Sequence, residues 1–496
     1  MSLAVVGVDL GTTNSCVTII DKDIPKCLYF APTCISFVDD QVIFGEFYNS
    51  SERCSNFKRL IGVFYKDYQN NALLQECFNT NTTSIEKDDT TGLCCFVMKS
   101  GKRFSVNTLV EMFYKHLYNK AQEIMQSPQS LKAVITVPIH FSDFQKKTMM
   151  ACATKAGFNV LKVMSEPSAA CLAYQTIPTN QIETILVIDC GGGTTDLSVI
   201  SIDNENNILE AKEVVGNNFL GGEDLTNTLF KFVYEKFGLQ TKPRTKDALK
   251  MQCEKVKKEL SFCKQSTIYL EELDLSFKVS RSLFEDLNKQ FFQNLKEMLS
   301  KISVSPLRII LVGGTTRIPK FVDVCRETCK EICNTLDPDK TVSIGAAMVF
   351  KNNDIDPVIL IDVLPLSLGV NANGGSMVPI ISKNTPYPIS RTRTFVNDQD
   401  YLETIDIDVY QGNHRFVKNN ILLGKFKLSH PMFASFRKGE IKLNVTFTVD
   451  GNGLLQVTAS YLDKTNIDVA IVDIAGARAF DIDKHIEEAS YSKWEN

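Results

Sequence analysis

The chain has 496 residues, too many for one hydrophobic core and typical of two to four domains. Its apolar content of 44% and charged content of 23% are ordinary for a globular protein, and its net charge of −4 gives no support to nucleic-acid binding. Apolar runs are too short for a membrane span and the N-terminus lacks a secretory signal, so we expect a cytoplasmic protein with reduced thiols, not bound to a membrane.

The first predicted elements are two short strands joined by a glycine turn, Asp9-Leu-Gly-Thr-Thr13. The same pattern returns at Asp189-Cys-Gly-Gly-Gly-Thr-Thr-Asp196, again between two apolar runs. Glycine allows a sharp bend close to a ligand, free N–H groups of such a turn bind phosphate oxygens, and an Asp at a strand end can hold hydrated Mg²⁺. We therefore expect the two hairpins to bind one triphosphate from both sides.

Helical patterns alternate with short apolar runs over residues 1–355, which indicates α/β architecture. The predicted helices cover 107–125, 142–156, 223–236, 246–262 and 281–300. The two hairpins suggest an internal duplication with a cleft between two lobes. A third glycine turn, Gly313-Gly-Thr-Thr-Arg317, lies between an apolar run and a helix and offers another nucleotide contact. Beyond it, the i, i+4, i+8 spacing of Cys325, Cys329 and Cys333 predicts a buried helix face rather than a metal site.

The pattern changes to β-structure after residue 362. Residues 352–356 are polar and break the helix, and an apolar connector follows at 357–362. Residues 404–410 and 441–449 alternate between apolar and polar, and the turn 450–453 leads to another strand, which predicts a small antiparallel sandwich. A last segment, 482–494, could form a few helical turns.

Seven motifs in order resemble the heat-shock 70-kDa chaperones of the actin and sugar-kinase superfamily. They begin at Gly7, Ala133, Ser165, Asp189, Leu220, Leu311 and Asp362. The resemblance implies an α/β fold: a two-lobed, duplicated actin-like ATPase domain (1–355), an interdomain linker (356–363) and an antiparallel β-sandwich substrate-binding domain (364–476). It also implies a helical lid after the sandwich, whereas residues 477–496 suggest only a short helical remnant, so we expect a lidless member.

The ATPase residues of the family can be transferred one at a time. By resemblance, Asp9 and Asp189 hold Mg²⁺ through water, Lys58 contacts the γ-phosphate, and Asp196 is the proton acceptor beside Glu166. The remaining catalytic residue is Thr194. The residues expected to bind ATP or ADP are Gly11, Thr12, Thr13, Asn14, Gly191, Gly192, Gly193, Thr194, Gly221, Gly222, Glu254, Lys257, Lys258, Ser261, Gly313, Gly314, Thr315, Arg317 and Asp339.

The chain also departs from the family pattern. Lys258 replaces an arginine that can stack on adenine, and Asn14 replaces an aromatic residue. Lys162, His140 and Ser142 stand where the family typically has Arg, Tyr and Asn. In the sandwich, the resemblance assigns an apolar peptide pocket to Val370, Phe395, Ile405, Ile407 and Leu454, under an arch whose two residues are polar here, Asn373 and Asp398.

The predicted function is therefore an ATP-dependent chaperone of protein folding and the stress response. It would bind unfolded, extended apolar peptides and couple peptide capture to ATP hydrolysis, with J-domain proteins and nucleotide-exchange factors as partners. The alternative is a nucleotide-binding structural or assembly partner with weak or no hydrolysis. A small-molecule kinase of the same superfamily is a third possibility, but it would have no use for the sandwich.

Overall fold

The computed structural model describes residues 5–38, 41–46, 52–78, 83–126, 130–174, 182–203, 205–206, 208–217, 219–239, 243–350, 359–429, 432–461 and 469–473. The predicted helix break at 352–356, the start of the predicted linker and the predicted helical remnant at 477–496 lie outside these residues.

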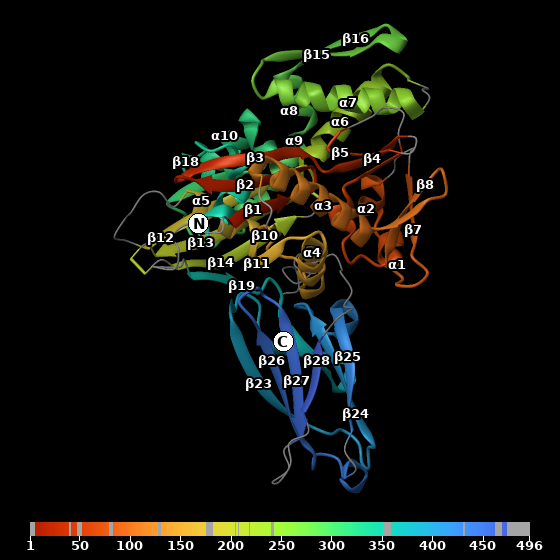
Figure 1. Ribbon diagram of the computed structural model, residues 1–496, viewed down its shortest axis with the longest axis vertical. Coiled ribbons are helices and arrows are strands. Elements are labelled where there is room, and N and C mark those ends of the chain that lie inside the picture. The colour runs from red at the N-terminus through yellow and green to blue at the C-terminus, as the bar shows by residue number, and fades with distance from the viewer. Residues whose placement is uncertain are drawn as a thin grey trace.

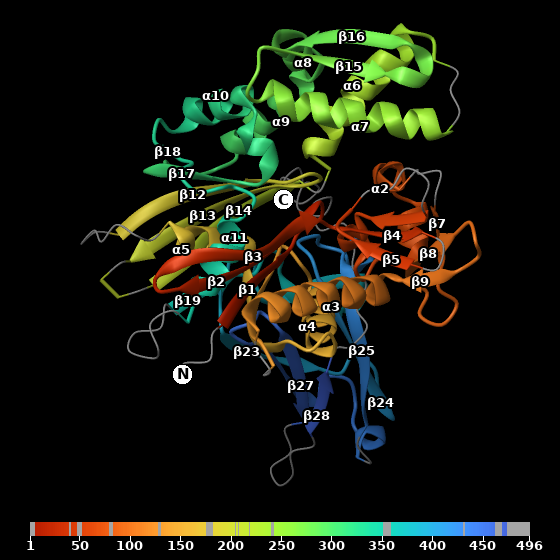
Figure 2. The same cartoon turned by 45° about the horizontal axis from the view of Figure 1, so that its top comes forward.

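Two sheets share one strand pattern (Figures 1 and 2). The first has the order β11-β10-β1-β2-β3 and the second contains the order β18-β17-β12-β13-β14. In each, three antiparallel strands are followed by two parallel ones, and the predicted hairpin occupies the same place. The first sheet comprises β1 (Val5–Leu10), β2 (Asn14–Asp21), β3 (Ile24–Pro32), β10 (Lys132–Val137) and β11 (Asn159–Ser165). The second comprises β12 (Ile182–Cys190), β13 (Thr195–Asp203), β14 (Ile208–Asn217), β17 (Arg308–Val312) and β18 (Ile332–Cys333).

Two short helices, α5 (Glu166–Ala173) and α11 (Thr341–Met348), pack on each other between the two sheets. Their approach depends on glycine, because a Cβ on Gly345 would collide with the backbone of Ala169 and one on Gly7 with that of Ser343. The two helices therefore pack closely on each other and on the first sheet. The hairpin turns that follow β1 and β12 are held by this packed interior.

The longer helices lie where the apolar periodicity predicts them. They are α3 (Val106–Met125), α4 (Asp143–Lys155), α6 (Gly222–Lys236) and α7 (Pro243–Leu260), and α10 (Pro319–Thr328) follows the third glycine turn as expected. A capping box at Ser142 and Gln145 fixes the start of α4. The helix predicted over 281–300 is two helices, α8 (Arg281–Leu287) and α9 (Lys289–Ser300). Asn288 interrupts it with a non-helical backbone, and its side-chain amide donates to the carbonyl of Phe284 at 2.9 Å.

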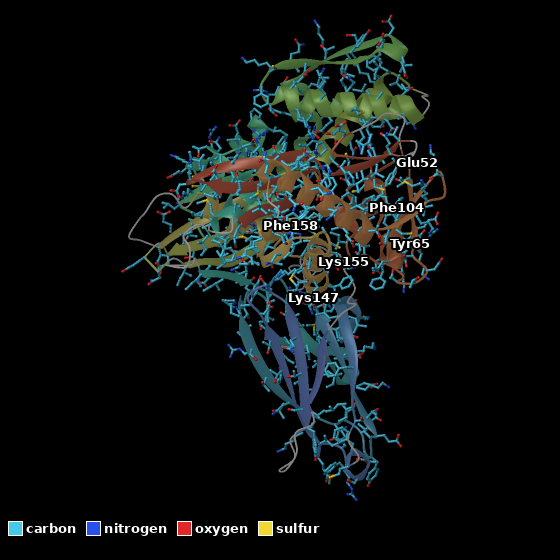
Figure 3. The ribbon with its side chains drawn as sticks, viewed as in Figure 1. Glu52, Tyr65, Phe104, Lys147, Lys155 and Phe158 are labelled. Carbon is cyan, nitrogen blue, oxygen red and sulfur yellow. The ribbon has the colours of Figure 1, made fainter. Side chains whose placement is uncertain are left out.

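Smaller elements extend from each sheet. Next to the first lie the sheets β5-β4-β6 and β7-β8-β9, two short helices and a single 3₁₀ turn, η1 (Phe57–Leu60). Their bounds are β4 (Cys34–Val38), β5 (Gln41–Phe44), β6 (Glu52–Ser55), α1 (Tyr65–Gln69), α2 (Ala72–Cys77), β7 (Thr83–Lys87), β8 (Cys94–Met98) and β9 (Arg103–Ser105). Figure 3 labels Glu52, Tyr65 and Phe104 in this region. Above the second sheet, α7 and α8 adjoin a hairpin of β15 (Gln265–Leu270) and β16 (Leu275–Ser280).

The C-terminal part is a sandwich of two four-stranded antiparallel sheets, as the alternation predicts. One sheet has the order β21-β20-β24-β25 and the other β23-β26-β27-β28. The strands are β20 (Leu368–Ala372), β21 (Ser376–Ile381), β23 (Ile389–Val396), β24 (Thr404–Gln411), β25 (Ile421–Ser429), β26 (Lys442–Val449), β27 (Leu455–Tyr461) and β28 (Val469–Asp473). Inward residues such as Val409, Phe447 and Val457 are fully buried between the sheets.

The connector joins this sandwich to the second sheet. Strand β19 (Ile359–Val363) pairs in parallel with β14 and antiparallel with the two-residue strand β22 (Pro386–Tyr387). Figure 3 shows Lys147, in the first half of α4, closer to the sandwich than Lys155 at the other end of that helix. The sandwich therefore lies against α4 and the connector.

The cysteine prediction is wrong in one respect. Cys325 is buried in α10, but this helix ends at Thr328, Cys329 has an extended backbone and Cys333 lies in β18, so the three share no helix face. All 15 cysteines are free thiols, as expected. Among the described residues, no cluster of His, Cys, Asp and Glu side chains has the arrangement of a metal site, and no helix is long and apolar enough to cross a membrane.

Candidate active site

The glycine turns predicted to bind phosphate meet at one place. Gly192 faces Thr13 so closely that a Cβ would overlap the threonine methyl group, which brings the two hairpin turns together. Gly221 packs in the same way on Gly193, and the N–H of Gly222 donates to the carbonyl oxygen of Gly191 at 3.0 Å. Three turns that are far apart in the sequence are thus brought together. They carry Gly11, Thr12, Thr13, Asn14, Gly191, Gly192, Gly193, Thr194, Gly221 and Gly222.

The third glycine turn joins the same group. The hydroxyl of Thr315 donates to the carbonyl oxygen of Gly191 at 2.7 Å, and Gly313, with a φ of 80°, packs on Cys190 next to Asp189. Gly314 lies against the carboxylate of Asp339, which accepts from the guanidinium of Arg317 at 3.1 Å. The place where the hairpin turns meet is therefore bordered by Gly313, Gly314, Thr315, Arg317 and Asp339.

Charged side chains gather beneath these turns. Lys58 and Glu166 form an ion pair with an Nζ–Oε1 distance of 2.7 Å, and only 4% of the lysine side chain is exposed. Asp9 accepts a hydrogen bond of 2.9 Å from the hydroxyl of Thr136. Their electrostatic influence on one another links Asp9, Glu166, Asp189, Asp196 and Lys58 into one cluster.

This cluster holds more negative than positive charge out of water. Burial, followed by the Glu166 carboxylate, raises the pKa of Asp9 to about 7, and the same two causes raise the pKa of Asp189 well above its usual range. Burial also raises the pKa of Asp196 to about 6, while His140 opposes that rise. The raised pKa values mean that negative charge on these carboxyl groups is unfavourable without a nearby cation. A bound cation would stabilise that charge, so the site has the chemistry expected for Mg²⁺.

The same carboxylates do not form a direct metal cage. No three of the described acidic, histidine or cysteine side chains are grouped as ligands of one ion. Asp9 and Asp189 thus fit a hydrated Mg²⁺ held through water and by phosphate oxygens, which is the usual way this ion binds beside a nucleotide.

The residues predicted on the adenosine side begin along α7. Lys257 is buried and donates to the carbonyl oxygen of Gly222 at 2.7 Å, and its Nζ lies 2.6 Å from Oε2 of Glu254. The Thr226 hydroxyl donates to the same oxygen at 2.6 Å. Lys258 differs, because 71% of its side chain is exposed, and Ser261 follows the end of the helix and is half-buried. Glu254 and Lys257 therefore join the glycine turns, whereas Lys258 is mostly exposed and its Nζ lies 3.4 Å from Oε1 of Glu254.

Comparison with known proteins decides the family. The family model described as Hsp70 protein matches residues 5–496. This chain belongs to the Hsp70 family. It is 31% identical to the chaperone protein DnaK of Anaplasma marginale (strain St. Maries) over 493 residues, which cover 92% of this chain and 74% of that relative. It is 30% identical to the chaperone protein DnaK of Ureaplasma urealyticum over 99% of this chain and 82% of that relative.

The residues of this Hsp70 chain that were assigned to a peptide pocket do not all lie together. Val370 and Ile407 are buried in the sandwich core, and Phe395 and Ile405 are half-buried beside it. Leu454 lies instead in the turn between β26 and β27, directly before Leu455, whose N–H donates to Asp143 of α4. It is therefore at the end of the sandwich that faces α4.

Leu443, which the sequence analysis did not assign to the pocket, lies beside one of the assigned residues. This residue is the cross-strand partner of Phe395 and packs in one cluster with Leu428 and Ile405. Strand alternation places Leu443 on the inner face, but only the register of β23 against β26 shows which inward residue neighbours Phe395.

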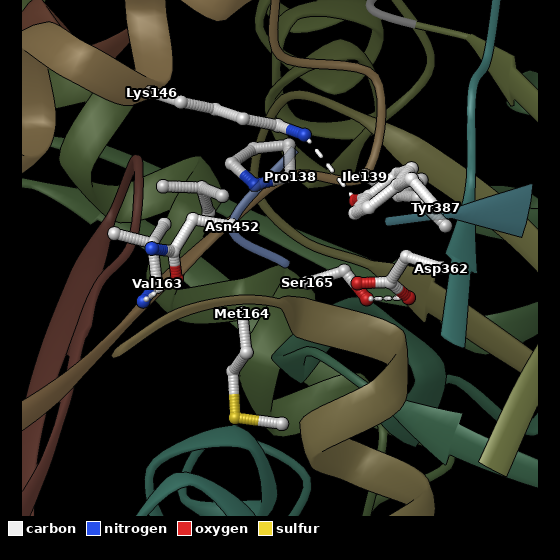
Figure 4. Close-up of a pocket in the computed structure, with 10 residues that line it drawn as sticks. Pro138, Ile139, Lys146, Val163, Met164, Ser165, Asp362, Tyr387 and Asn452 are labelled. Atoms are coloured by element: carbon white, nitrogen blue, oxygen red, sulfur yellow. Dashed lines mark hydrogen bonds between the residues drawn. The ribbon is translucent and has the colours of Figure 1, made fainter. Parts of the chain in front are cut away.

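The connector and the sandwich of this Hsp70 protein contact β11 and α4 (Figure 4), and the connector also contacts α5. Asp362 accepts from the hydroxyls of Ser165 and Ser168 at 2.9 and 2.6 Å. The Asn452 side chain accepts from the Val163 N–H at 3.2 Å, and buried Lys146 lies 3.4 Å from the hydroxyl of Tyr387. Ser165 directly precedes Glu166, so these contacts reach within one residue of the charged cluster.

Proposed function

We propose that this Hsp70 protein binds ATP with Mg²⁺ between its two related sheets, hydrolyses it to ADP and phosphate, and couples hydrolysis to the capture of extended apolar peptides in the sandwich. The observation that carries the proposal is the convergence of Asp9, Asp189, Asp196, Glu166 and Lys58 beneath three glycine turns. The domains are proposed as 1–355 for the ATPase, 356–363 for the linker and 364–476 for the sandwich.

Each group has a task that its position suits. The N–H groups of the glycine turns bind phosphate oxygens, together with Thr12, Thr13 and Thr194. Lys58, anchored by Glu166, neutralises charge on the γ-phosphate and orients the attacking water. Asp196 accepts the proton of that water. Mg²⁺, when bound, supplies further charge neutralisation at the phosphate oxygens.

Peptide binding responds to ATP through the connector. Strand β19 extends the second sheet beside β14, and Asp362 at its end is bound by Ser165 and Ser168 just before the charged cluster. A change in the distance between the two sheets would alter these hydrogen bonds, and by linkage peptide binding would alter nucleotide affinity. Unfolded clients, J-domain proteins and nucleotide-exchange factors are the proposed partners, and the cytoplasmic location stays a prediction.

A second candidate is a nucleotide-binding assembly partner with weak hydrolysis. The side chain of Lys258 favours it, because its ammonium group is mostly exposed, lies 3.4 Å from Oε1 of Glu254 and cannot stack on adenine as a guanidinium can. The buried ion pair of Lys58 with Glu166 favours hydrolysis, since this pair acts on the γ-phosphate rather than on adenine.

Single-turnover hydrolysis of MgATP separates the two candidates. The wild type should release phosphate to water, and Lys58→Ala should be at least about 100-fold slower while it still binds MgATP. Lys155→Ala is the matched control: it removes the same side chain from α4, where the lysine is 70% exposed and outside the charged cluster. Equal rates for the wild type and Lys58→Ala would reject the enzyme and favour the assembly partner. Phosphate release that required an added sugar would instead indicate a small-molecule kinase.

A further inference from the structure

We propose that Asn56 is a positioning residue for hydrolysis: its hydrogen bonds to Glu223 fix the turn that carries Lys58 against the glycine turn at 191–193. The inference deepens the proposed function and rests on it. The turn in question is η1, a single 3₁₀ turn that begins directly after Asn56.

The backbone of Asn56 is unusual. Its φ of 58° and ψ of 11° lie in the left-handed region, which asparagine tolerates better than most residues other than glycine. Its side chain makes no capping hydrogen bond to η1, although it stands at the N-cap position. The amide is therefore directed away from its own turn.

The amide reaches α6 instead. Nδ2 of Asn56 lies 3.0 and 3.3 Å from the two carboxylate oxygens of Glu223, and only 8% of Asn56 is exposed. Glu223 lies in the first turn of α6, and its own N–H donates to the carbonyl oxygen of Gly192 at 2.6 Å. One glutamate thus joins the Lys58 turn to the phosphate-binding loop.

Neighbouring residues hold the turn from its other sides. Phe57 is fully buried and packs on Phe113 of α3 with ring centroids 6.0 Å apart. Arg59 lies directly over Gly193, where a Cβ would overlap its guanidinium group. Phe57 therefore fixes the turn within the first half of the ATPase region, and Asn56 and Arg59 fix it against the second half.

This arrangement matters for the rate because Lys58 and the glycine turn are both expected to contact the same phosphate. A displacement of about 1 Å between catalytic groups can slow a reaction about 100-fold. Loss of the contact between Asn56 and Glu223 is expected to act on the catalytic step more than on nucleotide affinity, which depends on many other contacts.

Exchange of the two hydrogen-bonding groups tests this inference. Asn56→Asp keeps the shape and the tolerance for a left-handed backbone but places two carboxylates together. Glu223→Gln retains an acceptor for the asparagine amide. The double variant Asn56→Asp/Glu223→Gln restores a hydrogen bond in the opposite direction, from the Gln amide to the Asp carboxylate. Asn70→Asp adds the same charge at an exposed position and serves as the control.

The readouts are the single-turnover hydrolysis rate at saturating MgATP, the MgATP dissociation constant by calorimetry, and the melting temperature. We expect Asn56→Asp to hydrolyse about 10-fold more slowly or worse with affinity changed less than about three-fold, and the double variant to recover most of the rate. Asn70→Asp should match the wild type.

Two results would overturn the inference alone: an active wild type with Asn56→Asp equally fast, or a slow Asn56→Asp whose rate the double variant does not recover. Absence of hydrolysis in the wild type would refute the proposed function first, and this inference with it.

Discussion

The Nδ1 nitrogen of His140 lies 3.2 Å from the Oδ1 oxygen of Asp196, and both side chains are about 5% exposed. Burial raises the pKa of Asp196 to about 6, and the imidazole is the main influence that lowers it. Glu166 raises it further, and Lys58 lowers it. His140 therefore opposes the effect of burial, which favours the protonated form of the proposed proton acceptor.

Replacement of His140 by Phe should raise the pKa of Asp196 above its wild-type value, because burial remains and the opposing imidazole is lost. A ¹³C NMR titration of aspartate carboxyl carbons in the nucleotide-free protein measures this, with Asp196→Asn to assign the signal. His140→Gln keeps a polar partner and should give an intermediate value. An unchanged titration midpoint in His140→Phe would show that the imidazole has no influence on Asp196.

Glu254 should make the free energy of unfolding depend on pH in the acid range. Burial raises its pKa, but Lys257 and the Thr226 hydroxyl outweigh burial and hold the pKa at about 2, below the usual 4.5. A lowered folded-state pKa contributes stability above pH 4.5 that is lost as the pH falls towards 2. Because 35% of the side chain is exposed, solvent screening limits this contribution to about 1 kcal/mol.

Glu254→Gln should therefore lower the free energy of unfolding by about 1 kcal/mol at pH 7, and the difference from the wild type should shrink as the pH falls below about 4. Urea unfolding at several pH values measures it. Glu297→Gln, at an exposed position of α9, is the control. A difference that stays constant down to pH 2.5 would contradict the assigned pKa.

The predictable parts of the fold are those encoded over a few neighbouring residues. The two hairpins were predictable because an apolar run, an Asp and a glycine turn follow one another in each. The helix predicted over 281–300 was not, because its apolar spacing continues through Asn288, and the break shows only in the non-helical backbone of Asn288 and the hydrogen bond of its side chain to Phe284.

Contacts between distant segments lay beyond sequence reasoning. The residues His140 and Asp196 are 56 positions apart, and Asn56 and Glu223 are 167 apart, so that only the fold brings them together. Leu454 was assigned to the pocket by resemblance to the family, and the local sequence carries no marker of its place along the sandwich. The register of the strands provides that marker and places Leu443, not Leu454, beside Phe395.

Asp362 should link ATP binding to peptide release. Asp362→Ala would remove the acceptor of the Ser165 and Ser168 hydroxyls and so weaken the contact between the connector and α5. We expect ATP to accelerate release of a fluorescent peptide several-fold less in this variant than in the wild type, with basal peptide affinity retained. Asp323→Ala, at an exposed position of α10, is the control. Release that ATP accelerates equally in both variants would exclude this route.

We predict opposite effects on peptide affinity for truncation of Leu443 and of Leu454. Leu443 packs with Ile405 beside its cross-strand partner Phe395, so Leu443→Ala should weaken binding of an apolar peptide about 10-fold. Leu454→Ala should leave affinity unchanged, because Leu454 lies in the turn against α4. Since Leu443 is buried, its truncation also destabilises the sandwich by about 2–5 kcal/mol.

Leu455→Ala separates the loss of a pocket wall from the loss of stability. Leu455 is as deeply buried as Leu443, at 3% against 2% exposed, but it is part of the sandwich end that contacts Asp143. Its truncation should lower the melting temperature by a similar amount and leave peptide affinity near the wild-type value in fluorescence anisotropy below the melting transition. If Leu443→Ala and Leu455→Ala weakened peptide binding equally, peptide affinity would follow the stability of the sandwich. If only Leu454→Ala weakened it, the peptide pocket would lie at the turn next to α4.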